Sequence, residues 1–373
     1  MKTKVILVRH GQSTYNAEKR YQGCCDDSVL TEAGFSMASQ TGALLKNTKI
    51  DAVYCSPLKR TQQSAIAILE QLESGLELNC HERLKEIVMP AWEGLPFKYV
   101  RQHLAEDYEC WKERPHEFQM PHVLESTGSL ATLTKAETQC FPVLDLYTQA
   151  EQFWEEILPK HSGETILIVS HGGTIRALIG TAIDSDSRSF HALQQSNCGV
   201  SVLEFSQDLH HPAQLALANS TQHLGESLPK LKAGKLGLRL LLVSDQDQND
   251  VEQLAALIQS IQLDLCLTCD RNDLLARSLF SHRPEPVIHL RTAQSNFFEI
   301  WHRALQASSA QSASLTTGIA IASPDVIRRV LSQTLDISAN PSALCLKPGA
   351  ISILHYPVNH RPVLQSLNFS QSI

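Results

Sequence analysis

One stretch near the N-terminus decides the fold of this chain: Val5-Ile6-Leu7-Val8-Arg9-His10-Gly11-Gln12-Ser13-Thr14-Tyr15-Asn16. Its apolar residues predict a buried strand that ends at Arg9 and His10. In α/β proteins, ligands bind at the carboxyl edge of the parallel sheet. Gly11 lets the backbone turn close to whatever His10 faces, and Arg9 offers a charged fork for phosphate oxygens. The stretch alone suits either a phosphate site or a solvated loop.

Apolar strands and amphipathic helices alternate through the first 206 residues. We expect strands at residues 4–8, 51–55, 76–80, 165–170 and 198–205. We expect helices after Thr31, after Ser56-Pro57, within 135–159 and over 174–182. Such alternation is typical of a three-layer α/β/α sandwich with a mostly parallel central sheet.

The alternation stops and then resumes. Residues 207–236 are polar, contain prolines and glycines and show no sustained period, so we predict a linker there. Beyond it, strands are expected at 238–243 and 263–268, and helices at 250–261 and 324–335. The 373 residues therefore predict two domains, 1–206 and a smaller α/β domain at 237–373.

Composition excludes several classes of function. The net charge of −7 argues against nucleic-acid or anionic-membrane partners, which need a concentrated positive surface. We find no apolar run of membrane-spanning length and no signal peptide, so we expect a cytoplasmic protein. The ten cysteines are expected to be free thiols. Cys266 and Cys269 have redox-motif spacing but lie in a run typical of a buried strand.

Two further strand ends carry residues suited to anions. Ser56-Pro57-Leu58-Lys59-Arg60-Thr61 follows the second strand and places Arg60 in the first turn of a helix. Ser170-His171-Gly172-Gly173 follows the last long apolar strand, at another strand-to-helix turn. Because parallel strands end at one edge of a sheet, two arginines and two histidines are expected to meet there. Together they predict a phosphate pocket.

This set resembles the histidine phosphatase superfamily, the phosphoglycerate mutase-like proteins, over residues 3–205. The matching elements occur in the family's order: Leu7 to Ser13 with Asn16, Gln22-Gly23, Leu30-Thr31-x-x-Gly34, Ser56 to Thr61, Leu84-x-Glu86 with Trp92-Glu93-Gly94, and Ser170-His171-Gly172. Residues 111–117 and 195–199 look most similar to the tandem-domain members of cyanobacteria and plants. That group includes 2-carboxy-D-arabinitol 1-phosphate phosphatases, so the resemblance suggests a sugar-acid phosphate as substrate.

The resemblance implies a catalytic role for each matching residue. His10 would attack phosphorus as a neutral nucleophile, with a hydrogen bond to its other ring nitrogen fixing the tautomer. Arg9, Arg60 and His171 would hold the equatorial oxygens in the transition state. Glu86 would protonate the leaving oxygen and then activate water. The nearby carboxylates Glu82 and Glu93 are alternatives for that role. Contacts to the bound group would come from Asn16, Gly23 and Gly172.

These roles predict a metal-independent phosphomonoester hydrolase with a phosphohistidine intermediate. No cofactor is expected, because the arginines supply the positive charge. Mutases of the superfamily carry an Arg-His-Tyr run that Glu86 to Gly94 lacks, which favours water as the acceptor. Mutase-type transfer remains one alternative. A non-catalytic phosphate sensor is the other, although binding alone needs neither a nucleophile nor an acid.

Two segments bear on which small phosphorylated metabolite is the substrate. Residues 95–130 are expected to form a lid whose cations meet a carboxylate, a second phosphate or solvent; they are Lys98, Arg101, Lys112 and Arg114. Cys24-Cys25 stands where relatives often carry a basic residue. These thiols either pack in the structure or alter substrate choice.

The second domain aligns with the first. Leu240-Leu241-Leu242-Val243-Ser244-Asp245 matches Val5 to His10, which puts Asp245 at the nucleophile position. Arg60 falls at Asp273 and His171 at Ser323. The apolar skeleton persists without the pocket residues, and aspartates there would repel phosphate. We predict a degenerate copy that stabilises, regulates or dimerises the first domain, with a homodimer as a candidate assembly. An unrelated α/β domain is the alternative.

Overall fold

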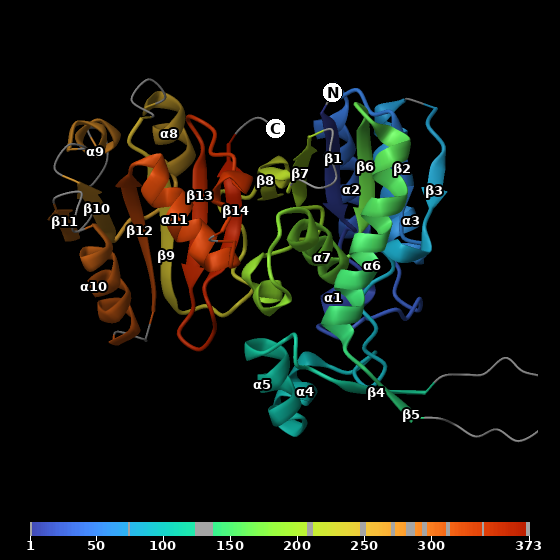
Figure 1. Cartoon of the computed structure of the whole chain (residues 1–373). Helices are drawn as coiled ribbons and strands as arrows, with labels where there is room; N and C mark the ends of the chain where they lie inside the picture. The colour runs from blue at the N-terminus through green and yellow to red at the C-terminus, as the bar shows by residue number, and fades with distance from the viewer. Residues whose placement is uncertain are drawn as a thin grey trace, which may run out of the picture.

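The computed structural model describes residues 2–73, 75–123, 137–206, 212–246, 251–269, 273–280, 288–292, 297–310, 314–337 and 339–370. Within these residues, twelve strands form one sheet in the order β11-β10-β12-β9-β13-β14-β8-β7-β1-β6-β2-β3. Figure 1 shows two α/β units side by side along this sheet. We call residues 2–220 the N-terminal unit, 237–370 the C-terminal unit and 221–236 the inter-unit segment.

The N-terminal unit is a mostly parallel sheet between two helix layers. Its strands in the main sheet are β1 (Thr3–Arg9), β2 (Ala52–Cys55), β3 (Leu78–Cys80), β6 (Thr165–Ser170), β7 (Val200–Phe205) and β8 (Gln214–Ser220). Its helices are α1 (Thr14–Glu18), α2 (Glu32–Leu45), α3 (Lys59–Leu72), α4 (Phe97–His103), α5 (Ala105–Glu113), α6 (Pro142–Ile157) and α7 (Gly172–Ala182). A separate ribbon pairs β4 (Met120–Val123) with β5 (Glu137–Cys140). The predicted three-layer fold is confirmed.

Strand β1 is covered on both faces, because successive residues of a strand point to opposite sides. Ile6 and Val8 pack with residues of α2 and α3, whereas Val5 and Leu7 pack with residues of α6 and α7. All four side chains are fully buried. This explains why the strand is a continuous apolar run rather than an alternating one.

The C-terminal unit repeats the same topology. Its strands are β9 (Gly237–Ser244), β10 (Leu265–Cys269), β11 (Ile288–Thr292), β12 (Leu315–Ala322), β13 (Ile351–Tyr356) and β14 (Val363–Phe369). Its helices are α8 (Val251–Ile258), α9 (Asp273–Phe280), α10 (Phe297–Ala310) and α11 (Pro324–Leu335). The order β14-β13-β9-β12-β10-β11 matches β8-β7-β1-β6-β2-β3, read outward from the join between the units.

The strand registers of the two units also correspond. Ile6 of β1 pairs with Leu167 of β6, and Leu241 of β9 pairs with Ile319 of β12. The N–H of His10 donates to the carbonyl of Ser170 at 2.9 Å, and that of Asp245 donates to Ala322 at 2.9 Å. This register places Asp245 and Ser323 at the positions of His10 and His171.

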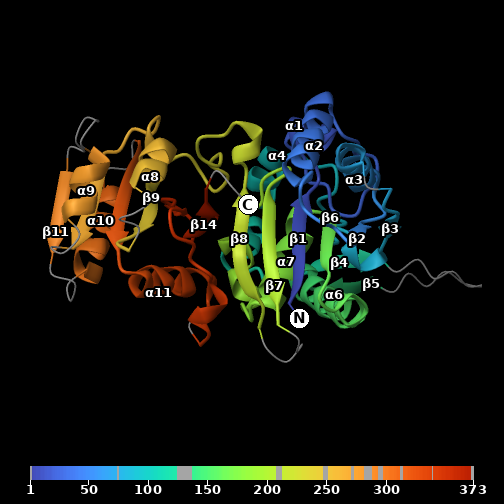
Figure 2. The ribbon, with the colours of Figure 1, turned by 90° about the horizontal axis from the view of Figure 1, so that it is seen from above.

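The two units join edge to edge through β8 and β14, as the view from above shows (Figure 2). Asn219 Nδ2 donates to the carbonyl of Gln365 at 2.6 Å, and Asn368 Nδ2 donates to that of Ala216 at 2.8 Å. Gln194 and Leu364 form one backbone hydrogen bond, and Cys345 and Leu215 form its counterpart. Each contact thus occurs twice in opposite directions, as in a two-fold symmetric dimer interface.

Two sequence-based boundaries differ from the structure. Strand β8 lies inside residues 207–236, so the prediction of a linker is wrong for Gln214–Ser220. Its stability depends on pairing with β7 and β14, which a local pattern does not reveal. Within the predicted helical region, residues 137–140 form β5, and α6 begins only at Pro142, which suits a first helical turn. No helix in the described residues is long and apolar enough to cross a membrane.

Replacing Asn219 by alanine tests the join between the units. Asn219 is buried at a φ of +50°, and its Oδ1 also accepts the N–H of Ser196 at 2.7 Å. We expect Asn219→Ala to lower the free energy of unfolding by about 2–4 kcal/mol in urea unfolding, because buried partners lose hydrogen bonds and alanine disfavours this backbone. The exposed Asn47→Ala is the control, with an expected change of less than about 0.5 kcal/mol. Similar values for both variants would contradict the prediction.

Candidate active site

His10 lies fully buried at the carboxyl end of β1. Its Nδ1 is 2.7 Å from the carbonyl oxygen of Gly11. A carbonyl only accepts, so Nδ1 carries the proton and Nε2 keeps its lone pair. Burial, together with the charges of Arg9 and Arg60, holds the pKa of His10 well below its ordinary value. The ring is therefore neutral, in the tautomer that a nucleophile attacking through Nε2 requires.

Arg60 stands in the first turn of α3 and is fully buried. Its Nη1 donates to the carbonyl of Cys25 at 2.8 Å, and its Nη2 donates to that of Gly23 at 2.9 Å. These bonds fix the loop around Gly23. Gly23 has a φ of +52°, and a Cβ there would collide with Oε1 of Glu93. Arginine and loop therefore hold each other in place.

Arg9 approaches the same pocket from the end of β1. Its Nη1 donates to the carbonyl of Gln195 at 2.9 Å. Gly172 opens α7 beside it, where a Cβ would lie 3.3 Å from Nε of Arg9. Among the described residues, Nε of Arg9 and Nε of Arg60 have no hydrogen-bond partner. Both guanidinium groups thus keep a donor for an anion.

His171 is the N-cap of α7, with its ring centre 5.3 Å from that of His10. Its Nε2 lies 2.8 Å from Oγ of Ser56, which accepts the N–H of Leu58. Among the described residues, the other ring nitrogen of His171, Nδ1, has no hydrogen-bond partner. Burial and nearby Arg60 hold the pKa of His171 well below its ordinary value. His171 is therefore neutral, and Nδ1 remains available to a ligand.

Glu86 sits against the N-terminus of α7. Its carboxylate accepts the N–H groups of Gly173 and Thr174, each at 3.2 Å. A Cβ at Gly173 would collide with Oε1 of Glu86, so glycine is needed for this approach. The contact is typical of an anion at a helix start.

The two rival carboxylates have other partners. Glu93 accepts the N–H of Cys24 at 2.6 Å, and Glu82 pairs with Lys85 at the surface at 2.7 Å. Only Glu86 of the three lines the pocket. The thiol of Cys24 donates to the carbonyl of Glu86 at 2.8 Å, and burial raises its pKa to about 12. Cys24 is therefore a packing thiol.

A cavity of about 250 Å³ lies above these groups. Five of the sequence-predicted residues line it: Arg9, Asn16, Gly23, Glu86 and Gly172. His10, Arg60 and His171 are buried beside this lining through the contacts above. Asn16 Oδ1 accepts from Nδ2 of Asn197 at 2.9 Å, and Asn197 Nδ2 also lies 3.1 Å from the carbonyl of His10. The structure therefore brings all eight predicted residues together.

Comparison with known proteins agrees with this geometry. The family model of the histidine phosphatase superfamily (branch 1) matches residues 5–217. The chain belongs to the histidine phosphatase superfamily. The sequence-based assignment is thus confirmed, and so is the similarity to the type that includes 2-carboxy-D-arabinitol 1-phosphate phosphatases.

Relatives match mainly the N-terminal unit. "Probable 2-carboxy-D-arabinitol-1-phosphatase" of Arabidopsis thaliana is 36% identical over 202 residues, 54% of this chain and 38% of that protein. This chain thus spans less than half of that relative. Phosphoserine phosphatase 1 of Hydrogenobacter thermophilus is 31% identical over 60% of this chain and 95% of its own. The structure of YhfR of Bacillus stearothermophilus, 25% identical, superposes with a TM-score of 0.50, covering 60% of this chain and 99% of its own.

Besides Arg9, the active-site cavity is lined by four cations that the sequence did not place there: Arg20, Lys112, Arg176 and Lys232. Lys112 of α5 was expected only as one of several lid cations, whereas Arg176 of α7 and Lys232 of the inter-unit segment were not expected at all. Arg176 lies four residues after Gly172, one helical turn along, and this spacing is a signal that could have identified it. Its Nε donates to the carbonyl of Leu193 at 2.7 Å. Lys232 lies in a segment without any local signal.

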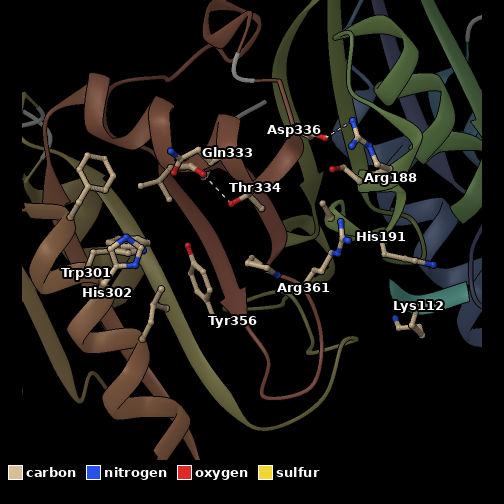
Figure 3. A pocket seen from close by; sticks show the side chains of 16 residues that line it. Lys112, Arg188, His191, Trp301, His302, Gln333, Thr334, Asp336, Tyr356 and Arg361 are labelled. Carbon is tan, nitrogen blue, oxygen red and sulfur yellow. Dashed lines mark hydrogen bonds and ion pairs between the residues drawn. The ribbon is translucent and has the colours of Figure 1, made fainter. Parts of the chain in front are cut away.

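A second cavity, of about 410 Å³, lies between the two units (Figure 3). Its labelled lining includes Lys112, Arg188 and His191 from the N-terminal unit, and Trp301, Tyr356 and Arg361 from the C-terminal unit. Arg188 lies 3.8 Å from Asp336, and Arg361 lies 3.9 Å from Glu113. Lys112 lines both this cavity and the active site.

The buried, neutral His10 predicts a pH dependence of stability. In the unfolded chain a histidine gains a proton below about pH 6.5, whereas in the folded chain its pKa is far lower, so stability falls as pH falls. Between pH 7.5 and 5.5, one such histidine lowers the free energy of unfolding by about 1.4 kcal/mol. We expect the free energy of unfolding, measured in urea at both pH values, to fall by about 1.4 kcal/mol less in His10→Asn than in wild type. The non-titrating control Asn47→Ala should show the wild-type loss, and an unchanged loss in His10→Asn would contradict the prediction.

Proposed function

We propose that the N-terminal unit hydrolyses phosphomonoesters of small metabolites through a phosphohistidine on His10, without a metal ion. One observation supports this most. A neutral histidine with its proton on Nδ1 is near enough to Arg9 and Arg60 for their charges to lower its pKa, and the Nε groups of both arginines have no partner in the described protein. Neutrality makes His10 a nucleophile, and the arginines attract the group that it attacks.

The proposed reaction has two halves. In the first, Nε2 of His10 attacks phosphorus, the bond to the leaving oxygen breaks, and Glu86 gives that oxygen a proton. In the second, water attacks the phosphohistidine, Glu86 takes the proton, and the phosphorus–nitrogen bond breaks. Phosphate leaves and Nε2 regains its lone pair. Glu86 therefore acts as a general acid in the first half and as a general base in the second.

Charge stabilisation comes from groups already in place. Arg9 and Arg60 are held by carbonyl oxygens, and His171 is held by Ser56. Because these donors need no reorganisation, they stabilise the equatorial oxygens as negative charge develops. Their burial strengthens the interaction compared with water.

We propose a sugar-acid phosphate, or a similar small acid that bears a phosphate, as the substrate. The names of the two relatives refer to 2-carboxy-D-arabinitol phosphate and to phosphoserine, which carry both a phosphate and a carboxylate. Water is the proposed acceptor, because Glu86 to Gly94 lacks the Arg-His-Tyr run of the mutases.

We further propose that the C-terminal unit is a non-catalytic copy. Its topology and register match the N-terminal unit, whereas Asp245 and Ser323 stand at the positions of His10 and His171. An aspartate at the nucleophile position would repel a phosphate dianion. The shared sheet makes stabilisation of the N-terminal unit its minimal role.

Phosphate release by wild type and two matched variants tests whether His10 is the nucleophile. Wild type, His10→Ala and Asp245→Ala are incubated with 3-phosphoglycerate, O-phosphoserine and p-nitrophenyl phosphate, with and without chelator. We expect His10→Ala to lose at least about 1,000-fold in kcat, because the nucleophile is gone. Asp245→Ala, the equivalent change in the copy, should stay within about two-fold of wild type, and chelator should have no effect.

Three outcomes would contradict this proposal. Equal release by wild type and His10→Ala would remove His10 from the mechanism. Loss of activity in chelator would require a metal. Conversion of 3-phosphoglycerate to its isomer, stimulated by a bisphosphorylated primer, would indicate a mutase instead.

The leaving group tests whether Glu86 is the acid. An alkoxide needs a proton as it leaves, whereas p-nitrophenolate does not, so Glu86→Gln should lower kcat about 100- to 10,000-fold on 3-phosphoglycerate and far less on p-nitrophenyl phosphate. Glu93→Gln is the matched control, because glutamine still offers an oxygen to the N–H of Cys24 and should stay within a few-fold of wild type. Equal losses on both substrates would argue against proton transfer by Glu86.

A further inference from the structure

The active-site cavity holds more positive charge than one phosphate requires. Its lining contains five basic side chains, Arg9, Arg20, Lys112, Arg176 and Lys232, and one carboxylate, Glu86. Arg20 is already paired with Glu18 at 2.7 Å, and Arg9 belongs to the phosphate pocket. Three cations therefore remain for another part of the ligand.

Those three cations come from three separate parts of the chain. Lys112 belongs to α5, Arg176 to α7 and Lys232 to the inter-unit segment. Lys232 lies outside residues 5–217, the range that matches the superfamily. Within the described protein, no hydrogen bond or ion pair engages the ammonium group of Lys232. Its charge is available to a ligand.

Both units hold the backbone that carries Lys232. Nε2 of Gln194, in the N-terminal unit, donates to the carbonyl of Lys230 at 3.0 Å. Nη2 of Arg239, on β9 of the C-terminal unit, donates to the carbonyl of Pro229 at 3.0 Å. Lys232 follows two residues later, so its place at the cavity depends on the two units being joined.

Charges crowd this side of the cavity. Lys232 is exposed at the surface by area, but desolvation by the protein around its ammonium group, followed by the charge of Arg9, lowers its pKa to about 7. Partial burial and the charge of Arg176 lower the pKa of Lys112 to about 8. An anion placed between the two lysines would relieve this repulsion. We take this anion to be a carboxylate, because the proposed substrates carry one besides their phosphate.

The space beyond the lysines suits the remainder of a small polar molecule. Lys112 and Lys232 also line an adjoining cavity of about 630 Å³. The α4–α5 segment contributes Arg101 and Tyr108 to it, and the C-terminal unit contributes Asn359 and His360. These groups can hydrogen-bond hydroxyl groups of a sugar-like chain.

We propose that Lys112, Arg176 and Lys232 form a second anion subsite, which binds the carboxylate of the substrate while its phosphate lies at His10. This subsite rests on the proposed function and specifies its substrate class. Lys232 is a specificity residue that the tandem architecture supplies to the active site.

Two pairs of substrates isolate the carboxylate. 3-Phosphoglycerate and glycerol 3-phosphate differ only by a carboxylate in place of CH₂OH, and O-phosphoserine and O-phosphoethanolamine differ only by the carboxylate. The wild-type chain of 373 residues, Lys232→Ala and Lys235→Ala are compared on both pairs. Lys235 is the matched control, since it is an exposed lysine in the same segment that does not line the described cavities.

Lys232→Ala should lower kcat/KM on the carboxylate-bearing members by about 10- to 100-fold, mainly through KM, as expected for one lost charged hydrogen bond. On the members without a carboxylate, Lys232→Ala should change kcat/KM less than about three-fold. Lys235→Ala should behave as wild type on all four substrates. Equal effects on both members of a pair, or no effect, would overturn the subsite. A selective loss on fructose 1,6-bisphosphate against fructose 6-phosphate, without one on the carboxylate pairs, would overturn the carboxylate assignment.

Binding separates failure of the subsite from failure of the hydrolase. In the His10→Ala background, calorimetry should show tighter binding of 3-phosphoglycerate than of glycerol 3-phosphate, and Lys232→Ala should remove that difference. Absence of the difference would overturn the subsite whatever the turnover results. Turnover retained by His10→Ala would instead overturn the hydrolytic mechanism and leave the binding result valid.

Discussion

The site depends on keeping one buried histidine neutral among cations. Burial and the charges of Arg9 and Arg60 keep His10 neutral, and its hydrogen bond to the carbonyl of Gly11 fixes the tautomer. That bond requires a tight turn, and the N–H of Gly11 is held by Oγ of Ser64 at 3.0 Å. A Cβ at Gly11 would collide with the carbonyl of Gly34 on α2. The close packing of α2 and α3 against the end of β1 is therefore part of the nucleophile's chemistry.

The residues that the sequence predicted correctly share one geometric cause. Arg9, His10, Arg60 and His171 each stand at the end of a parallel strand or in the helical turn after it, and such ends meet at one edge of the sheet. The local sequence at each strand end was therefore enough to predict the site, because the topology of the sheet brings these strand ends together. The apolar runs also predicted β1 and β6, since strands covered on both faces are continuously apolar.

The features that the sequence did not predict depend on contacts between separate elements: 146 positions separate Asn219 from Gln365, and 36 separate Gln194 from Lys230. Strand β8 is polar at Asn219 and Ser220, and these residues are buried because Asn219 bonds to β14. Lys232 reaches the cavity because Gln194 and Arg239 hold the preceding backbone from opposite units. The sequence around Lys232 is polar and contains proline, and it does not show that this lysine reaches the cavity. Sequence periodicity describes only the structure within a few helical turns or one strand.

The tandem arrangement also bears on why the two units differ. The contacts between β8 and β14 are nearly symmetric, with Asn219 and Asn368 exchanging equivalent bonds. The connection between the units cannot be symmetric, since one chain has only one segment from the end of the first unit to the start of the second. Anything that this segment delivers, including Lys232, therefore serves one active site and not its counterpart. An active site that relies on the segment can persist in only one unit, whereas the scaffold and the shared sheet remain useful in both.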